Sequence, residues 1–195
     1  MAKITRLLLF AAVALAFWGG AAPAADLDIW PDGRATIDGQ SFRCALGRAG
    51  VSAAKREGDG ATPVGQFPPR MVLFRPDIFA ASPPTKLPVQ PLAVDDGWCD
   101  DPALAQYNRM VKLPFAGSHE ILWRADDRRY DLIVPLGYND DPPRPGLGSA
   151  IFLHVAKDDY EPTSGCVGFA KGDLLAIVGR LGPDSLVRIH ATPAR

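Results

Sequence analysis

The sequence predicts a mostly β domain, a closed or sandwich-like sheet with one or two packed helices. Short apolar runs separated by turn residues recur along the chain, and only one segment sustains a helical spacing of apolar positions. The 195 residues also include 19 prolines and 19 glycines, which are scattered along the chain. This composition is typical of a loop-rich globular domain rather than a disordered one.

The N-terminus has the features of a secretion signal. Two basic residues precede an apolar run over residues 7–18, and Ala22 and Ala24 then form a small-x-small cleavage pattern. The run is shorter than the roughly 20 residues that a membrane span needs. We therefore expect residues 1–25 to be a signal peptide and residues 26–195 to be one domain, located in the periplasm without stable membrane insertion. The alternative is an uncleaved N-terminal anchor.

The charge balance excludes some classes of partner. Removal of Lys3 and Arg6 with the signal leaves 19 basic against 22 acidic residues. No basic block stands out, so the electrostatic footprint of a nucleic-acid or anionic-membrane partner is missing. About 170 residues remain, which is enough for one domain with a sizeable core. We expect a monomer that binds no nucleic acid.

The first half of the domain predicts short strands. Residues 35–38 and 41–46 are strand-like on either side of a tight turn at Gly39-Gln40. Residues 71–74 form another apolar strand. Residues 76–91 contain five prolines, so we expect an irregular surface excursion there.

The second half of the domain predicts further strands and the one clear helix. The expected elements are strands over residues 120–124, 130–136, 149–155 and 185–190, and a helix over residues 172–181. The first two strands are expected to pair through the polar turn at residues 126–129. The strand at 149–155 is apolar and follows a Pro/Gly loop, so we expect it to be buried. The helix begins near Gly172-Asp173 and ends before Gly182-Pro183.

Three cysteines make an odd number in an exported chain. One of them, Cys166, is expected to remain as a reactive thiol. Cys44 and Cys99 are then free to form a disulfide, which would stabilise the fold by ~3–4 kcal/mol on the chain-entropy model. The alternative is a pair of small buried thiols.

The segment from His154 to Gly168 carries the chemistry. His154 ends a predicted strand, and Cys166 follows twelve positions later, directly after Ser164-Gly165. A thiol is mostly protonated at neutral pH and needs a neighbouring imidazole to become a thiolate. A glycine before the nucleophile leaves the backbone open, so the N–H groups of Gly165 and Cys166 could form an oxyanion hole. On spacing alone, a satisfied core histidine and a small buried cysteine explain the pair equally well.

This segment resembles the signature of the L,D-transpeptidase catalytic domain, often called the YkuD domain. In that family a histidine and a loop precede Ser-x-Gly-Cys, a hydrophobic residue and usually an arginine. Here the residues are Thr163-Ser164-Gly165-Cys166-Val167, with Thr163 at the serine position. A second segment, Thr62-Pro63-Val64-Gly65-Gln66-Phe67, resembles the family's Thr-Pro-x-Gly-x-Phe segment before a strand. The resemblance runs from about residue 35 to residue 189.

The resemblance implies the catalytic-domain sheet of that family, with Cys166 as nucleophile, His154 as base, and Gly165 and Cys166 as oxyanion donors. The implied activity is that of a peptidoglycan L,D-transpeptidase, which forms a thioester with a stem peptide and transfers it to an amine. An L,D-carboxypeptidase or hydrolase and a non-catalytic wall-binding module on the same scaffold remain alternatives. No cofactor is expected.

Two departures from the family pattern stand out. Gly168 occupies the position of the usual arginine, so another group must do what that arginine does, or none does. The loop between His154 and Cys166 is short, which should alter the substrate groove. In the family a backbone carbonyl commonly orients the histidine, and the sequence does not assign that carbonyl here.

Several further side chains are candidates for substrate contact. They lie beside the nucleophile or flank the loop before the histidine strand, and are Ser164, Thr163, Tyr138, Asn139 and Ser149. Trp98 and Tyr107-Asn108 could line a cleft, but a packed tryptophan followed by a turn is the interpretation we favour. His119 and His190 have no partner at ligand spacing, so no metal site is expected.

Overall fold

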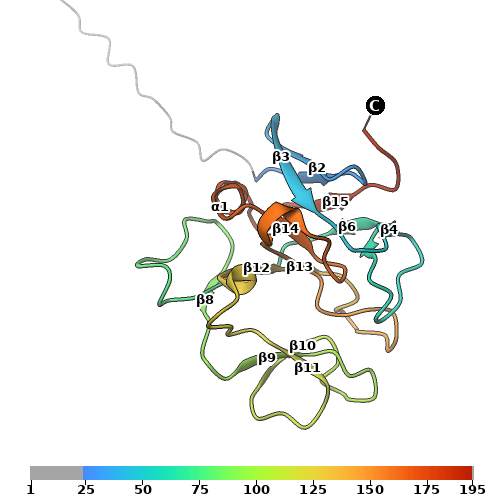
Figure 1. Ribbon diagram of the computed structural model, residues 1–195, viewed down its shortest axis with the longest axis vertical. Coiled ribbons are helices and arrows are strands. Elements are labelled where there is room, and N and C mark those ends of the chain that lie inside the picture. Colours follow the sequence, from blue (N-terminus) through green and yellow to red (C-terminus); the bar gives the residue numbers. More distant parts are fainter. Residues whose placement is uncertain (1–23, 195) are drawn as a thin grey trace, which may run out of the picture.

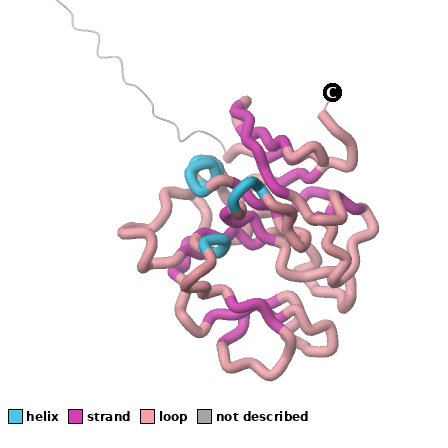
Figure 2. The backbone as a smooth tube through the Cα atoms, in the orientation of Figure 1, coloured by secondary structure: helices cyan, strands magenta, loops and turns pink. Residues whose placement is uncertain are grey.

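The computed structural model describes residues 24–194, drawn in colour in Figure 1. The predicted signal peptide therefore lies outside the described residues, apart from Ala24 and Ala25. In the part of the chain that is described, no helix has the length and apolar character needed to cross a membrane. Strands and loops make up most of this part, as Figure 2 shows.

The larger sheet has ten strands. Their order is β6 (Gly65–Phe67), β15 (Val187–Ile189), β1 (Leu27–Ile29), β2 (Arg34–Ile37), β3 (Gln40–Ala45), β14 (Val167–Phe169), β13 (Phe152–Val155), β12 (Leu132–Pro135), β7 (Val72–Phe74) and β8 (Val89–Pro91). β6 and β7 lie near opposite ends of this order, yet only four residues separate Phe67 from Val72, so their Cα atoms lie at most ~17 Å apart. The sheet must therefore curl. The predicted mostly β class is confirmed.

A second, three-stranded sheet faces part of the first. In it β9 (Asp96–Cys99) lies between β10 (Arg109–Lys112) and β11 (His119–Ile121), at the end of the molecule away from β2 and β3 in Figure 1. A short parallel pair, β4 (Val51–Ser52) and β5 (Thr62–Pro63), completes the strands.

The predicted pairing of residues 120–124 with 130–136 is wrong. β11 pairs with β9 in the small sheet, whereas β12 pairs with β13 and β7 in the large one. The polar stretch between them forms the 3₁₀ turn η1 (Arg128–Tyr130), whose first backbone N–H groups are capped by Asp127. This turn redirects the chain from one sheet to the other.

Other predicted elements are confirmed. β2 and β3 form the expected hairpin, but its turn is Asp38-Gly39, one residue earlier than predicted, and both residues have the positive φ angles that a tight two-residue turn requires. The helix, α1 (Lys171–Val178), starts at the expected place and ends earlier, at Gly179. The proline-rich excursion is irregular up to β8. A second 3₁₀ turn, η2 (Asp158–Tyr160), lies in the loop between β13 and β14.

The two faces of the large sheet have different neighbours. The larger core contains residues from strands at both ends of the order, such as Leu27 and Val72, together with Leu174 and Ile177 of α1. The smaller core lies between the other face and the small sheet. Side chains alternate along a strand, so Leu153 and Val155 enter the larger core while Phe152 and His154 point to the opposite face.

The expected disulfide is not formed. Cys44 and Cys99 are both free thiols in this structure. Cys44 lies in β3 and belongs to the larger core, whereas Cys99 lies in β9 of the small sheet. Because the two residues are buried in different sheets, the alternative of two small buried thiols describes them.

Candidate active site

The site lies where β13 and β14 run side by side. These strands are parallel, with Leu153 opposite Val167 and His154 opposite Gly168. Continuing this register places Cys166 opposite Phe152, two positions from His154 and on the same face of the sheet. Diagonal neighbours on one face lie roughly 7–8 Å apart, within reach of longer side chains. The strand pairing therefore explains why residues twelve positions apart in the sequence share one site.

The thiol of Cys166 is held by backbone groups. Sγ donates to the carbonyl oxygen of Ala150 at 3.1 Å and accepts from the N–H of Phe152 at 3.4 Å. Only 8% of the residue is exposed. Burial, with a contribution from the charge of Glu120, raises the pKa of the Cys166 thiol to about 12. The thiol of Cys166 is therefore neutral.

The imidazole of His154 is buried and oriented. Its Nδ1 lies 2.8 Å from the carbonyl oxygen of Val155, so a hydrogen on Nδ1 donates to that carbonyl and leaves Nε2 as the basic nitrogen. The ring of Tyr130 packs edge-on against it, with 5.7 Å between centroids. Burial lowers the pKa of His154 to about 4, so the ring is a neutral base. Val155 supplies the orienting carbonyl that the sequence could not assign.

The two groups share one cavity but are not hydrogen bonded to each other. This thiol cavity has a volume of about 310 Å³ and is lined by Glu120, Arg124, Arg129, Tyr130, His154, Lys157, Glu161, Pro162, Thr163, Ser164 and Cys166. The thiol proton points to Ala150 instead of the imidazole. The sequence-based expectation of a thiolate already formed by the imidazole therefore does not describe this state of the site. Rotation of the thiol away from Ala150 is required before His154 can accept its proton.

The turn before the cysteine explains the need for glycine. Gly165 has a φ of +134°, and a Cβ there would lie 2.8 Å from the carbonyl oxygen of Ala61. Thr163 fixes the turn, since its Oγ1 accepts from the N–H of Gly165 at 3.1 Å and donates to the carbonyl of Cys166 at 2.7 Å. The Gly165 N–H is thereby bonded in this structure, and the oxyanion role of Gly165 and Cys166 stays a prediction. Thr163 lines the thiol cavity while holding the backbone.

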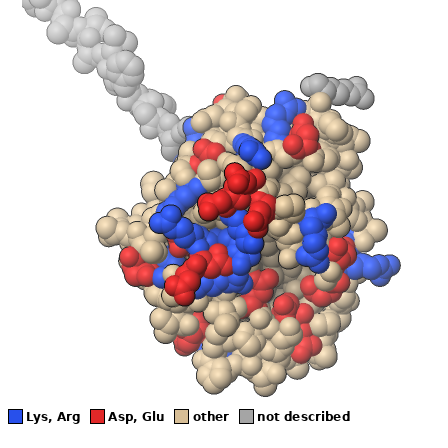
Figure 3. Space-filling model, in the orientation of Figure 1, with Lys and Arg blue, Asp and Glu red and all other residues tan. Residues whose placement is uncertain are grey.

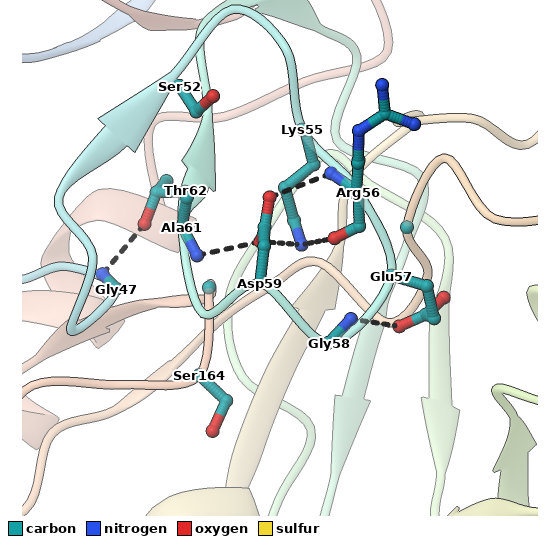
Figure 4. Close-up of polar contacts among 12 residues, drawn as sticks. Gly47, Ser52, Lys55, Arg56, Glu57, Gly58, Asp59, Ala61, Thr62 and Ser164 are labelled. Atoms are coloured by element: carbon teal, nitrogen blue, oxygen red, sulfur yellow. Dashed lines mark hydrogen bonds and ion pairs between the residues drawn. The ribbon is translucent and has the colours of Figure 1, made fainter.

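A second cavity is also lined by Cys166. This loop cavity, about 210 Å³, is lined by Arg48, Lys55, Glu57, Gly58, Asp100, Glu120, Ser149, Ala150, Ile151, Ser164 and Cys166. Figure 4 shows the loop from Lys55 to Thr62 folded on itself, with Asp59 at its centre and Ser164 on a neighbouring segment of the same chain. Asp59 accepts from Lys55 Nζ and from the backbone of Arg56 and Ala61.

The predicted substrate contacts separate into two groups. Ser164 lines both cavities and accepts a hydrogen bond from Arg48, and Ser149 lines the loop cavity and donates to Glu57. Tyr138 and Asn139 do not line either cavity. The hydroxyl of Tyr138 donates to the carbonyl of Leu147, and the amide of Asn139 donates to two carbonyls of the same loop. Their polar groups hold the loop before β13.

Trp98 and Asn108 form a structural link, as the sequence interpretation favoured. Trp98 packs edge-on against Phe152, with 5.0 Å between centroids, and its indole N–H donates to Asn108. Asn108 is 3% exposed and also bonds the backbone of Tyr138, Asn139 and Ala150. Through Ala150, this amide supports the carbonyl that holds the thiol.

Sequence reasoning missed the charged wall of the thiol cavity. Glu120 lies in β11, and Arg124 and Arg129 lie between β11 and β12, where the sequence predicted a strand and a polar turn. Glu120 accepts from the hydroxyl of Tyr130 and from Arg124. The only signal in the sequence was the dense run of charged residues over 124–129, directly before Tyr130. The sequence does not show that this run faces a cavity.

Gly168 has no room for a side chain. It lies opposite His154 in β14, and a Cβ would lie 3.2 Å from Cα of Ala156 and 3.5 Å from Cβ of Ala45. No three His, Cys, Asp or Glu side chains within residues 24–194 come together as metal ligands.

The thiol of Cys166, just before β14, and the imidazole of His154, on β13, line one cavity beside two central strands of the large sheet. Residues 25–189 match the profile of the L,D-transpeptidase catalytic domain, YkuD, so the chain belongs to that family. Among solved structures, it is similar to L,D-transpeptidase 1 of Mycobacterium tuberculosis, with 9% sequence identity and a TM-score of 0.37. That match covers 85% of this chain and 61% of the mycobacterial one. No curated protein matches the sequence.

Proposed function

We propose that this protein is a cysteine acyltransferase that acts on peptidoglycan stem peptides, with Cys166 as nucleophile and His154 as base. One observation carries the proposal: a thiol on a turn that only glycine allows and a neutral, oriented imidazole line the same cavity. Family membership supports the transpeptidase class.

The proposed first step forms a thioester. As Sγ of Cys166 attacks the carbonyl carbon between an L-centre and a D-residue, the thiol proton passes to Nε2 of His154. The tetrahedral intermediate then collapses and the C–N bond breaks. His154 returns the proton to the leaving nitrogen, so a D-amino acid such as D-alanine is released.

The second step reverses the roles. An amine of another stem peptide attacks the thioester and gives a proton to His154, and the thiol takes that proton back as the C–S bond breaks. Transfer to the amine makes a cross-link, whereas transfer to water would make the protein an L,D-carboxypeptidase. A non-catalytic wall-binding module would do neither.

The negative oxygen of the intermediate needs a donor. The N–H of Cys166 is the proposed donor, because Gly165 already bonds Thr163. Removing one donor from an oxyanion hole of this kind costs about 3–4 kcal/mol in the transition state. The backbone geometry around Gly165 is therefore expected to matter nearly as much as the thiol.

Product analysis tests this function. Purified protein is incubated with stem tetrapeptides, and the products are separated and weighed by mass spectrometry, with Cys166→Ala as the control. Cross-linked dimers from the unsubstituted protein alone would support transfer. A shortened monomer would support hydrolysis instead, and no product from either protein would support the binding module.

Location and assembly belong to the same proposal. Export by residues 1–25 would place a monomeric domain in the periplasm, next to its substrate. N-terminal sequencing of protein recovered from that compartment would show cleavage after residue 24 or 25. Recovery of the uncleaved chain in the membrane fraction would support an N-terminal anchor.

A further inference from the structure

We propose that Arg129 binds the carboxylate of the amino-acid residue whose nitrogen His154 protonates. This inference rests on the proposed function and deepens it, because it assigns one end of the substrate to one wall of the thiol cavity. The ligand is the C-terminal carboxylate of the residue that leaves when the thioester forms.

The cavity continues into a charged cleft. The neighbouring hollow has a volume of about 610 Å³, and Arg129, Lys157 and Glu161 line it as well as the thiol cavity. Basic and acidic side chains intermix on this side of the molecule, as Figure 3 shows around the region where Figure 1 labels β12 and β14. A substrate extending from the thiol on this side therefore meets cations within a short distance.

Arg129 differs from Arg124 and Lys157 in having one nitrogen atom that bonds no partner among residues 24–194. Arg124 uses Nε on the carbonyl of Ile121 and its two terminal nitrogens on Glu120 and Asp127. The ammonium of Lys157 bonds Glu161.

The guanidinium of Arg129 uses Nε and Nη2 on Asp127, and no contact within residues 24–194 engages Nη1. The bonds to Arg129 and Arg124 lower the pKa of Asp127, so its carboxylate stays charged and holds Arg129 in place. Arg129 is thus a pre-positioned cation with one nitrogen left for a ligand.

The direction of proton transfer places the ligand. His154 must lie next to the leaving nitrogen to protonate it, so the released residue occupies the His154 side of the thiol. Its carboxylate is separated from that nitrogen by a single carbon atom, so it lies in the same cavity. The acyl part of the substrate is then directed toward the loop cavity, which Cys166 also lines. An amino-acid acceptor, whose amine approaches His154 in the second step, presents its carboxylate to the same cation.

The strand beside His154 supplies no cation at the position opposite it. That position is Gly168, where a Cβ would lie 3.2 Å from Cα of Ala156. The positive charge is instead supplied from η1, across the cavity.

A binding measurement tests the inference without turnover. The starting protein is Cys166→Ala, and its ligands are a stem tetrapeptide with a free C-terminal carboxylate and the same peptide as its C-terminal amide. We expect the free carboxylate to bind roughly 10- to 100-fold more tightly, the range for one charge-assisted hydrogen bond. Adding Arg129→Gln should abolish this preference.

Arg128→Gln is the matched control. It removes the same charge from the neighbouring residue, which is exposed and lines the charged cleft but not the thiol cavity, and it should leave the preference unchanged. An equal preference in the Arg129→Gln protein, or no preference in the starting protein, would overturn the inference. Acylation of the unsubstituted protein by the tetrapeptide is scored separately, and its absence contradicts the proposed function. Alkylation of Cys166 by iodoacetamide at an unchanged rate in Arg129→Gln shows that the cavity is intact.

Discussion

The thiol of Cys166 donates its hydrogen bond to the carbonyl of Ala150, 3.1 Å away. Ala150 has a φ of +53°, in the left-handed region that disfavours a side chain, and its N–H donates to Asn108 at 3.1 Å. A strained residue thus accepts the hydrogen bond of the neutral Cys166 thiol. Substrate must break this bond before the imidazole of His154 can act, so the resting site is expected to be unreactive toward small electrophiles.

Alkylation of Cys166 should therefore require high pH. Burial raises the pKa of its thiol to about 12, which leaves roughly a thousandfold less thiolate at pH 7 than in free cysteine. We expect the iodoacetamide rate, followed by peptide mass spectrometry, to rise through pH 10. Cys44, buried with a pKa also raised to about 12, is the control within the chain. A plateau for Cys166 between pH 6 and 8 would mean that a thiolate is already present.

The buried imidazole should make stability depend on pH. Burial lowers the pKa of His154 to about 4, so the unfolded chain takes up a proton near pH 6.5 while the folded chain does not. The contribution of His154 to the free energy of unfolding is therefore complete above pH 6.5. It is lost as the pH falls to about 4, by about 3 kcal/mol in total. Urea unfolding of the unsubstituted protein and of His154→Gln measures this. The loss attributed to His154 should be absent from the variant, and identical curves would contradict the assignment.

Substitution of Gly165 should damage acylation even with the thiol intact. In Gly165→Ala the new Cβ meets the carbonyl of Ala61 at 2.8 Å, in a backbone conformation that alanine rarely adopts. We expect a stability cost of roughly 1–3 kcal/mol and at least ~10-fold slower acylation.

Gly39→Ala is the control that separates the effect of backbone strain in general from the effect of changing the turn beside Cys166. Gly39 has a φ of +74° with nothing within 4 Å of its Cβ position, in the β2–β3 turn. This control should lose about 1–2 kcal/mol of stability and keep its acylation rate. Normal acylation by Gly165→Ala would contradict the role of the turn.

Loss of the Asn108 amide should loosen the thiol. Asn108→Ala leaves the N–H groups of Trp98 and Ala150 without their acceptor, which should cost roughly 2–4 kcal/mol. Because Ala150 is then no longer fixed, Cys166 should alkylate faster than before. Asn139→Ala is the comparison. It removes two hydrogen bonds within the loop before β13, from a residue that lines neither cavity. Equal alkylation rates in these two variants would show that Asn108 does not control the thiol.

Local pattern was sufficient for much of the fold. Alternating and apolar runs located β2, β3, β7, β13 and α1, because each of these elements buries one face in the larger core or, for β7 and β13, opposite faces in the two cores. Pairing between distant strands was not predictable in this way. The segment over 120–124 looked like the partner of the strand after it, but Leu122 is buried in the smaller core and β11 joins β9 instead.

The site shows the same limit. The thiol and the histidine were predictable because a glycine turn and a strand end leave marks in the sequence. Arg129 and Glu120 were not, since charges in a turn look solvated until the turn is packed against a cavity. The engagement of the Gly165 amide depends on one hydroxyl rotamer of Thr163, which no sequence pattern specifies.

The most direct test of the account is the intact mass of the protein after exposure to a carbapenem, a β-lactam that acylates the thiol of active family members. The unsubstituted protein should gain the mass of one carbapenem, His154→Ala should gain it far more slowly, and Cys166→Ala should not gain it. No adduct on the unsubstituted protein, or an equal adduct on Cys166→Ala, would contradict Cys166 as the nucleophile.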